Sequence, residues 1–170
     1  MKKMTKRFLS VILAALTVVT IIPVSAFAAD DVLTVSSADE LRQLSEAVAG
    51  GDSYAGKTVV LTADIDLGGE SSPWSPIGSS SASFAGTFDG GHHVVSGLYI
   101  ASGSSVGLFG DVNGGEIRGL TVRGEVSGSS NVAGIVGKLT AGTVTECGNE
   151  ASVSGSMIVG GVVGSVNGTC

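Results

Sequence analysis

The chain has 170 residues, 43% of them hydrophobic but only 5% aromatic, and a formal net charge of −6, a size that suits one domain. Four of its nine basic residues lie within the first seven positions, so the remainder carries 15 acidic side chains against five basic ones, a net charge of about −10. Nucleic acids and anionic membranes are bound through Lys and Arg, so this balance excludes both as partners.

Residues 1–28 have the pattern of a secretory signal peptide. Basic residues precede an apolar run from Phe8 to Ile22, and Ala26-Phe27-Ala28 forms an A-x-A cleavage site. The run is shorter than the roughly 20 residues that span a membrane, so we expect cleavage rather than retention, and no stable membrane span afterwards. No cysteine follows the run, so a lipid anchor is not expected. We predict a secreted or cell-surface protein.

The next segment, residues 29–56, is predicted to contain a strand and the one helix of the chain. Ser37 and Glu40 have the spacing of a capping box, and Gly50 is expected to end the helix in the left-handed conformation. An uncovered strand edge invites aggregation, so we interpret the helix as a cap over the strands that follow, with partner binding as the alternative. Its apolar side chains share one face, at Leu41, Leu44 and Val48.

Residues 57–170 are predicted to be strands and turns, and their first part holds the weak metal candidates. Asp64 and Asp66 are two positions apart on a predicted strand, so they lie on one face and would suit Ca²⁺ if further oxygens converged. No third acid is close in sequence, so solvated carboxylates are the preferred interpretation. Neighbouring His92 and His93 point to opposite faces of a strand and cannot easily share a metal, so we interpret them as part of a turn.

Trp74 is the weak candidate for ligand binding. An exposed tryptophan can stack on a sugar ring. It lies between Pro73 and Pro76 in a Ser-rich segment, which favours a loop folded back over the strands. We prefer this structural role and keep glycan binding as the alternative. No His-Glu-x-x-His zinc motif is present, and we predict no catalytic residue, metal or cofactor.

Three copies of one motif follow at a fixed period of 27 residues. They are Gly-Leu-Phe-Gly at 107–110, Gly-Ile-Val-Gly at 134–137 and Gly-Val-Val-Gly at 161–164. Short apolar alternations with Gly and Ser between them predict strands and turns, and a fixed period of this length predicts a repeat architecture. We therefore predict an all-β fold, a right-handed parallel β-helix with about 27 residues per turn and an N-terminal capping helix. The register also holds at Val112, Leu139 and Val166.

The motifs resemble a known family. Residues 84–100 (FAGTFDGGHHVVSGLYI), the later repeats and residues 57–67 with 74–78 are similar to bacterial secreted proteins that carry the GLUG motif. The family has Asn-Gly where this chain has Gly91 and His92, a difference confined to a turn. The resemblance implies surface or secreted modules, some of them attached to metallopeptidases or cell-wall anchors, and it marks an architecture rather than a chemistry.

An enzyme on this architecture would gather carboxylates on one side of the coil. By the period, Glu116 is matched by Thr143, Glu125 by Ser152 and Glu150 by Arg123, so the acids form no ladder. The charged residues considered are Glu116, Arg118, Arg123, Glu125, Glu146 and Glu150.

Cys147 falls in register with Leu120, and Cys170 falls four positions further along the turn. Four strand residues span about 13 Å, beyond the reach of a disulfide, so Cys147 is expected to be a small buried residue. A bridge involving Cys170 at the chain end stays open. The last residues begin a turn without a cap, which predicts either a longer parent chain or end-to-end self-association at this edge.

The favoured function is a non-catalytic extracellular stalk or adhesion surface that presents Ser, Thr, Asn and Gly to a host or cell-wall glycan or protein. The alternative is the N-terminal portion of a secreted polysaccharide-degrading enzyme, or of a surface metallopeptidase whose catalytic part is absent here. Carboxylates that converge on one groove would indicate the enzyme.

Overall fold

The structure is a computed structural model, and it describes residues 32–167. The predicted leader at 1–28 and Cys170 lie outside the described residues. The protein is mostly β, with one α-helix, α1 (Ala38–Ala49), and one 3-10 turn, η1 (Gly69–Ser71). The strands are β1 (Val32–Val35), β2 (Thr58–Leu61), β3 (Ile65–Asp66), β4 (Thr87–Asp89), β5 (Val94–Ile100), β6 (Ser104–Val106), β7 (Phe109–Arg118), β8 (Thr121–Val132), β9 (Val136–Thr145), β10 (Gly148–Asn149), β11 (Ser152–Val159) and β12 (Val163–Val166).

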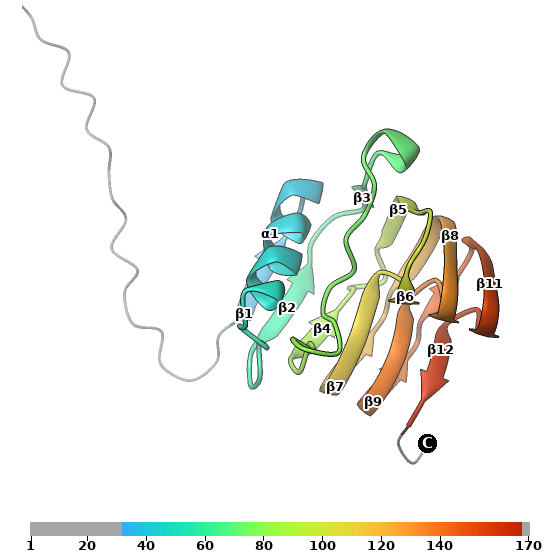
Figure 1. Cartoon of the computed structure of the whole chain (residues 1–170). Coiled ribbons are helices and arrows are strands. Elements are labelled where there is room, and N and C mark those ends of the chain that lie inside the picture. The colour runs from blue at the N-terminus through green and yellow to red at the C-terminus, as the bar shows by residue number, and fades with distance from the viewer. Residues whose placement is uncertain (1–31, 168–170) are drawn as a thin grey trace, which may run out of the picture.

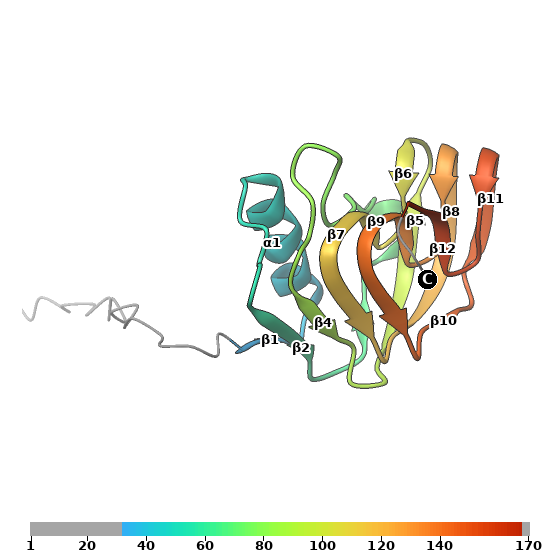
Figure 2. The ribbon, with the colours of Figure 1, turned by 90° about the horizontal axis from the view of Figure 1, so that it is seen from below.

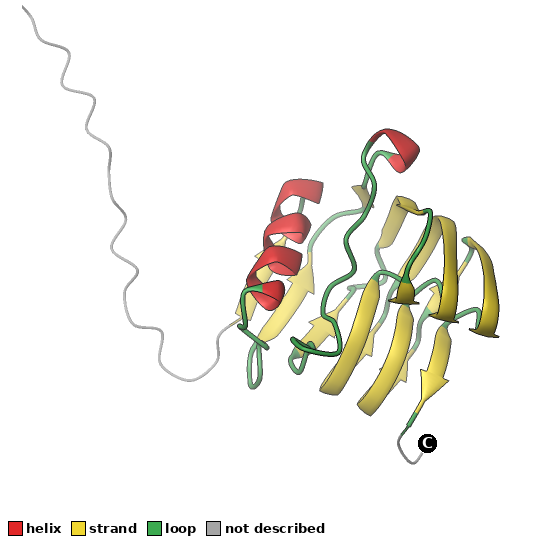
Figure 3. Cartoon of the chain, in the orientation of Figure 1, coloured by secondary structure: helices red, strands yellow, loops and turns green. Residues whose placement is uncertain are grey.

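The strands form two parallel sheets, drawn in yellow in Figure 3. The first has the order β1-β2-β4-β7-β9-β12, and the second has the order β10-β8-β5-β3, with β6 and β11 also paired to β8. Each pair of these strands is parallel, so no two neighbours are joined by a hairpin. The chain instead crosses between the sheets, and neither sheet is closed among the described residues.

The 27-residue period appears directly in the strand register of the second half. Val126 pairs with Val153, and Phe109 pairs with Val136, which pairs in turn with Val163. The predicted alignment of Val112, Leu139 and Val166 is also confirmed. Earlier pairs have other offsets: Thr58 pairs with Thr87, 29 residues away. The repeat is therefore visible in the sequence only where the turns have equal length.

Buried side chains from both sheets form one core, with aromatic rings at its centre. Phe84, Phe88 and Phe109 are fully buried, and the ring centroid of Phe109 lies 5.4 Å from that of Phe84 and 5.1 Å from that of Phe88. The strand ends between the sheets turn sharply, for example at Gly119, whose φ of +60° suits glycine. The predicted alternation around this bend is confirmed, since Ile117, Leu120 and Val122 are buried.

The helix α1 begins and ends differently in detail from the prediction. Ser37 is the N-cap, and its hydroxyl accepts a hydrogen bond from the N–H of Glu40. The Glu40 carboxylate, however, accepts from the N–H and hydroxyl of Ser36, not from Ser37. The prediction for Gly50 was wrong: it has φ −75°, and Gly51, with φ +105°, makes the left-handed turn. The apolar face is as predicted, with Leu41, Leu44 and Val48 buried.

The two ends of the sheets carry different elements. In Figures 1 and 2, α1 lies beside β1 and β2 at one end, whereas β11 and β12 lie at the other. The loop after η1 packs against α1: Arg42 donates hydrogen bonds to the carbonyls of Leu67 and Ser72, and Ser45 donates to that of Ser75. Within residues 32–167, no helix has the length and apolar character needed to cross a membrane.

Candidate functional site

The weak metal candidates each close a separate local structure. Asp64 precedes β3 rather than lying within it, because β2 and β3 belong to different sheets and a turn joins them. Its Oδ1 accepts a hydrogen bond from the N–H of Val94 at 2.9 Å and lies 3.1 Å from Nδ1 of His93, and these contacts lower the pKa of Asp64. Asp66 instead accepts from the N–H of Gly68. Among residues 32–167, no three His, Cys, Asp or Glu side chains gather in a way that could hold a metal ion.

Trp74 is an anchor for the loop after η1. Its side chain is only 5% exposed, and its Nε1 donates a hydrogen bond to the carbonyl of Leu108 at 3.0 Å. The guanidinium of Arg42 lies 5.4 Å from the ring centroid, a cation–π contact that adds to the attachment of α1. The ring therefore has no open face on which a sugar could stack, and the structural role is the one observed.

The His92-His93 pair lies in a turn between β4 and β5. His92 has φ +61°, and the carboxylate of Asp89 accepts a hydrogen bond from the N–H of Gly91, which closes the turn. The same Asp89 lies 2.8 Å from Arg118, which also lies 3.1 Å from Glu116. The hydrogen bond from Gly91 and the nearby guanidinium lower the pKa of Asp89. These charged groups therefore fix a corner of the fold.

Other charged side chains pair across successive turns. Arg123 lies 2.7 Å from Glu150, exactly one period away, and this pairing lowers the pKa of Glu150. Lys138 lies 3.3 Å from Asp111, its partner in the β7–β9 register. Sequence reasoning missed Asp111, although it is the one buried carboxylate among the described residues, at 3% exposure. Its spacing of 27 from Lys138 was the signal that would have found it.

Cys147 is half-buried, not fully buried as predicted. Its Sγ donates a weak hydrogen bond to the carbonyl of Thr145 at 3.1 Å, and burial raises the pKa of the thiol. A high thiol pKa disfavours the reactive thiolate, so the side chain fills space at a corner of the coil.

A shallow polar hollow of about 320 Å³ crosses three strand segments of the second sheet. Ser127 and Ser154 are neighbours in register, and their hydroxyl oxygens lie 2.8 Å apart. The hydroxyl of Ser129 donates to the carbonyl of Gly103. The small side chains leave the backbone accessible along this face. The hollow is lined by Ala101, Ser102, Gly103, Ser127, Gly128, Ser129, Ser154, Gly155 and Ser156.

The end of the sheets formed by β11 and β12 is open. Each strand pairs on one side only among the described residues, β11 with β8 and β12 with β9. Met157 is 63% exposed, and Ile158 is 54% exposed with φ +51°, an unfavourable conformation for a β-branched residue. Apolar side chains and unpaired backbone therefore occur together at this edge.

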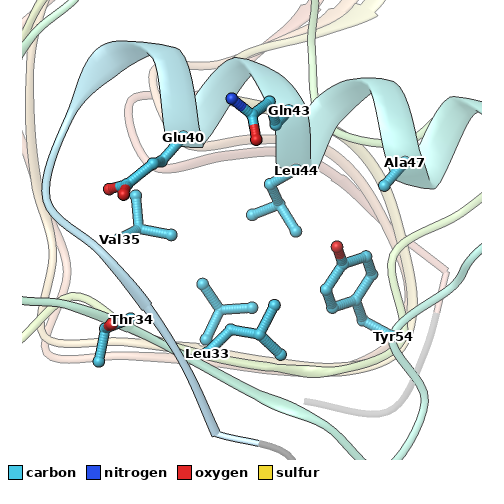
Figure 4. A pocket seen from close by; sticks show the side chains of 9 residues that line it. Leu33, Thr34, Val35, Glu40, Gln43, Leu44, Ala47 and Tyr54 are labelled. Carbon is cyan, nitrogen blue, oxygen red and sulfur yellow. The ribbon is translucent and has the colours of Figure 1, made fainter. Parts of the chain in front are cut away.

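At the opposite end, a cavity of about 310 Å³ lies between α1 and the first two strands (Figure 4). Sequence reasoning gave no sign of it, because a cavity depends on how closely a helix packs and not on residue pattern. It is lined by Leu33, Thr34, Val35, Glu40, Gln43, Leu44, Ala47, Tyr54 and Val59.

The structure thus defines a mostly β protein with parallel sheets, an open strand edge and a cavity under its one α-helix. Comparison with protein-family models, with curated proteins and with solved structures finds no match to this chain.

Proposed function

We propose that this chain is a right-handed parallel β-helix of the GLUG-motif type, secreted or held at the cell surface, that acts as a rigid stalk or adhesion module without catalysis of its own. In-register parallel pairing across three successive copies of the motif supports the coil, since Phe109, Val136 and Val163 stack in one line. The alternation of the chain between two sheets supports it as well.

The observation that carries the stalk role is the environment of the first motif glycine. A Cβ at Gly107 would lie 2.8 Å from the carbonyl oxygen of Ala133 in the next turn, and one at Gly134 would meet the Asn149 side chain and the carbonyl oxygen of Gly161. At Gly161, the nearest atom would be 3.9 Å away. The third copy thus retains a glycine that only a further turn would require. The open edge is a surface on which more of the same structure stacks, from a longer parent or a second copy.

Adhesion is assigned to the polar hollow on the second sheet. Its hydroxyls and accessible backbone groups suit an extended polar chain such as a host or cell-wall glycan, or a peptide. The outward charges support a structural role, because Arg118 and Arg123 pair with acids of neighbouring turns rather than facing a groove. The enzyme alternative then concerns a longer parent chain.

The test is to mix the chain lacking residues 1–28 with purified cell-wall polysaccharides, and to measure binding and the release of reducing ends together. The proposal expects binding without turnover, weakened by S154Y, which fills the hollow, and unchanged by S79Y in a distant loop. Turnover by the purified chain would contradict the non-catalytic role. Equal binding by both variants would remove the hollow from the account.

A further inference from the structure

The helix α1 covers its end of the core incompletely. Leu33 pairs in register with Val59, so both side chains project from the same side of the first sheet, toward the core. Val59 is fully buried, whereas Leu33 is 39% exposed. The difference arises because the space over Leu33 is the cavity between α1 and β1. An apolar surface that should be covered therefore faces an empty volume.

The walls of this cavity are mostly apolar. Leu44 and Ala47 project from α1, and Leu33 and Val59 project from the strands (Figure 4). Its volume of about 310 Å³ falls at the lower end of the range for small-molecule sites, which is roughly 300–1,000 Å³. The space therefore suits a small ring or a short branched chain, not a polymer.

Tyr54 supplies a polar group without a partner. The residue is 8% exposed, and its hydroxyl points into the cavity toward α1 (Figure 4). No residue in the 32–167 range forms a hydrogen bond with this hydroxyl. A buried hydroxyl without a partner is costly, and a ligand that accepts its hydrogen bond would remove the cost.

The ring of Tyr54 is held in place from several directions. The Phe84 ring stacks on it at 6.2 Å between centroids, and Nζ of Lys57 lies 4.8 Å from its centroid. Its backbone has φ +58°, an unfavourable conformation for a non-glycine residue, and the Asp52 carboxylate accepts a hydrogen bond from its N–H. Strain of this kind persists where the surroundings fix a residue, and it is frequent at binding sites. Burial raises the pKa of Tyr54, so the hydroxyl stays protonated and can donate.

The charge at the cavity limits the kind of ligand. Glu40 lines it, and hydrogen bonds from Ser36 lower the pKa of this carboxyl, so it is ionised at neutral pH. A negative charge at this position repels anions such as fatty acids and aromatic acids. Uncharged ligands meet no such repulsion.

We propose that the cavity under α1 binds a small, uncharged, ring-containing molecule with one oxygen that accepts a hydrogen bond from Tyr54. The site is independent of the stalk role, since it involves neither the polar hollow nor the open edge. It places a binding function in the cap rather than in the repeats.

The experiment titrates the chain lacking residues 1–28 with phenol, toluene and benzoate, and follows the methyl signals of Leu33, Leu44 and Val59 by NMR. Phenol is expected to shift these signals and to bind more tightly than toluene, while benzoate produces no shift. Y54F should weaken phenol binding by about tenfold, as expected for the loss of one hydrogen bond of about 1.4 kcal/mol, and leave toluene unaffected. The matched control is Y99F, the other tyrosine, which should bind phenol as the wild type does.

A second variant, A47F, fills the cavity without touching Tyr54. It should abolish the methyl shifts with phenol while α-helical circular dichroism is retained. The proposal is overturned if phenol causes no shift, if Y54F binds phenol as the wild type does, or if the residues before Val32 are found to fill the cavity in an experimental structure.

Discussion

The two ends of the sheets differ in how their apolar side chains are covered. At the end beside β1, α1 buries Leu41, Leu44 and Val48 against the core, and the loop after η1 is tied to the helix through Arg42. At the end beside β12, Met157 and Ile158 remain exposed. The comparison teaches that stacked strands provide no end of their own: a cap is a separate device, with its own sequence signals and hydrogen bonds.

The largest contrast is expected between matched positions in one ladder. Phe109 and Val163 belong to the same line of side chains, but Phe109 is fully buried against two other aromatic rings. F109A should lower the free energy of unfolding by about 3–5 kcal/mol. V163A, at the open end, should lower it by less than about 1 kcal/mol. Urea denaturation followed by circular dichroism measures both, and equal losses would refute the difference between the ends.

The first motif glycines provide the next contrast. G107A places a methyl group against the backbone of the following turn and should cost about 2 kcal/mol of stability. G161A meets nothing within 3.8 Å and should change stability by no more than about 0.5 kcal/mol. Thermal melts of the two variants decide the matter. If G161A is as damaging as G107A, then another structure already covers the open edge in solution.

The attachment of the cap depends on Arg42. R42A removes hydrogen bonds to the carbonyls of Leu67 and Ser72 and the contact with Trp74, so it should cost about 1–3 kcal/mol. E46A, an exposed position on the same helix, is the control and should be nearly neutral. Denaturant titration measures the loss, and proteolysis of the 38–49 segment reports whether the cap itself has loosened. A neutral R42A would mean that apolar packing alone holds α1.

The smallest expected effect is a gain. Position 158 follows Asn131 by one period, and both residues are left-handed, with φ +51° at Ile158 and +50° at Asn131. Asn tolerates this conformation, whereas a β-branched residue does not. I158N should therefore raise stability by about 1 kcal/mol, seen as a higher melting temperature. V159N, at a neighbouring position with ordinary φ, should give no gain. A fall in stability for I158N would show that Ile158 is packed in solution.

The fold was readable from the sequence where successive turns have equal length. Gly107, Gly134 and Gly161 show the period because each backbone lies against the next at the same point. The period was hidden before Gly107, where turns pair at offsets such as 29 residues. The end of α1 at Gly51 was missed, since Gly50 and Gly51 are equivalent in pattern and differ only in φ.

The sites were less readable than the fold. The sequence gave Trp74 its structural role correctly, because prolines and serines around it predict a folded loop. It could not reveal the Asp64–His93 contact, which joins two different turns, or the cavity beside Tyr54, which arises from the distance between α1 and β1. Such features depend on the placement of elements rather than on the local pattern.

Amide hydrogen exchange measured residue by residue tests the central claim, that one end is capped and the other open, most directly. At low protein concentration, where the chain is expected to be monomeric, the amides of β2 and α1 should be protected nearly as well as those of β7 and β9, while those of β11 and β12 exchange much faster. Protection of β11 and β12 equal to that of β7 in a verified monomer would contradict the account.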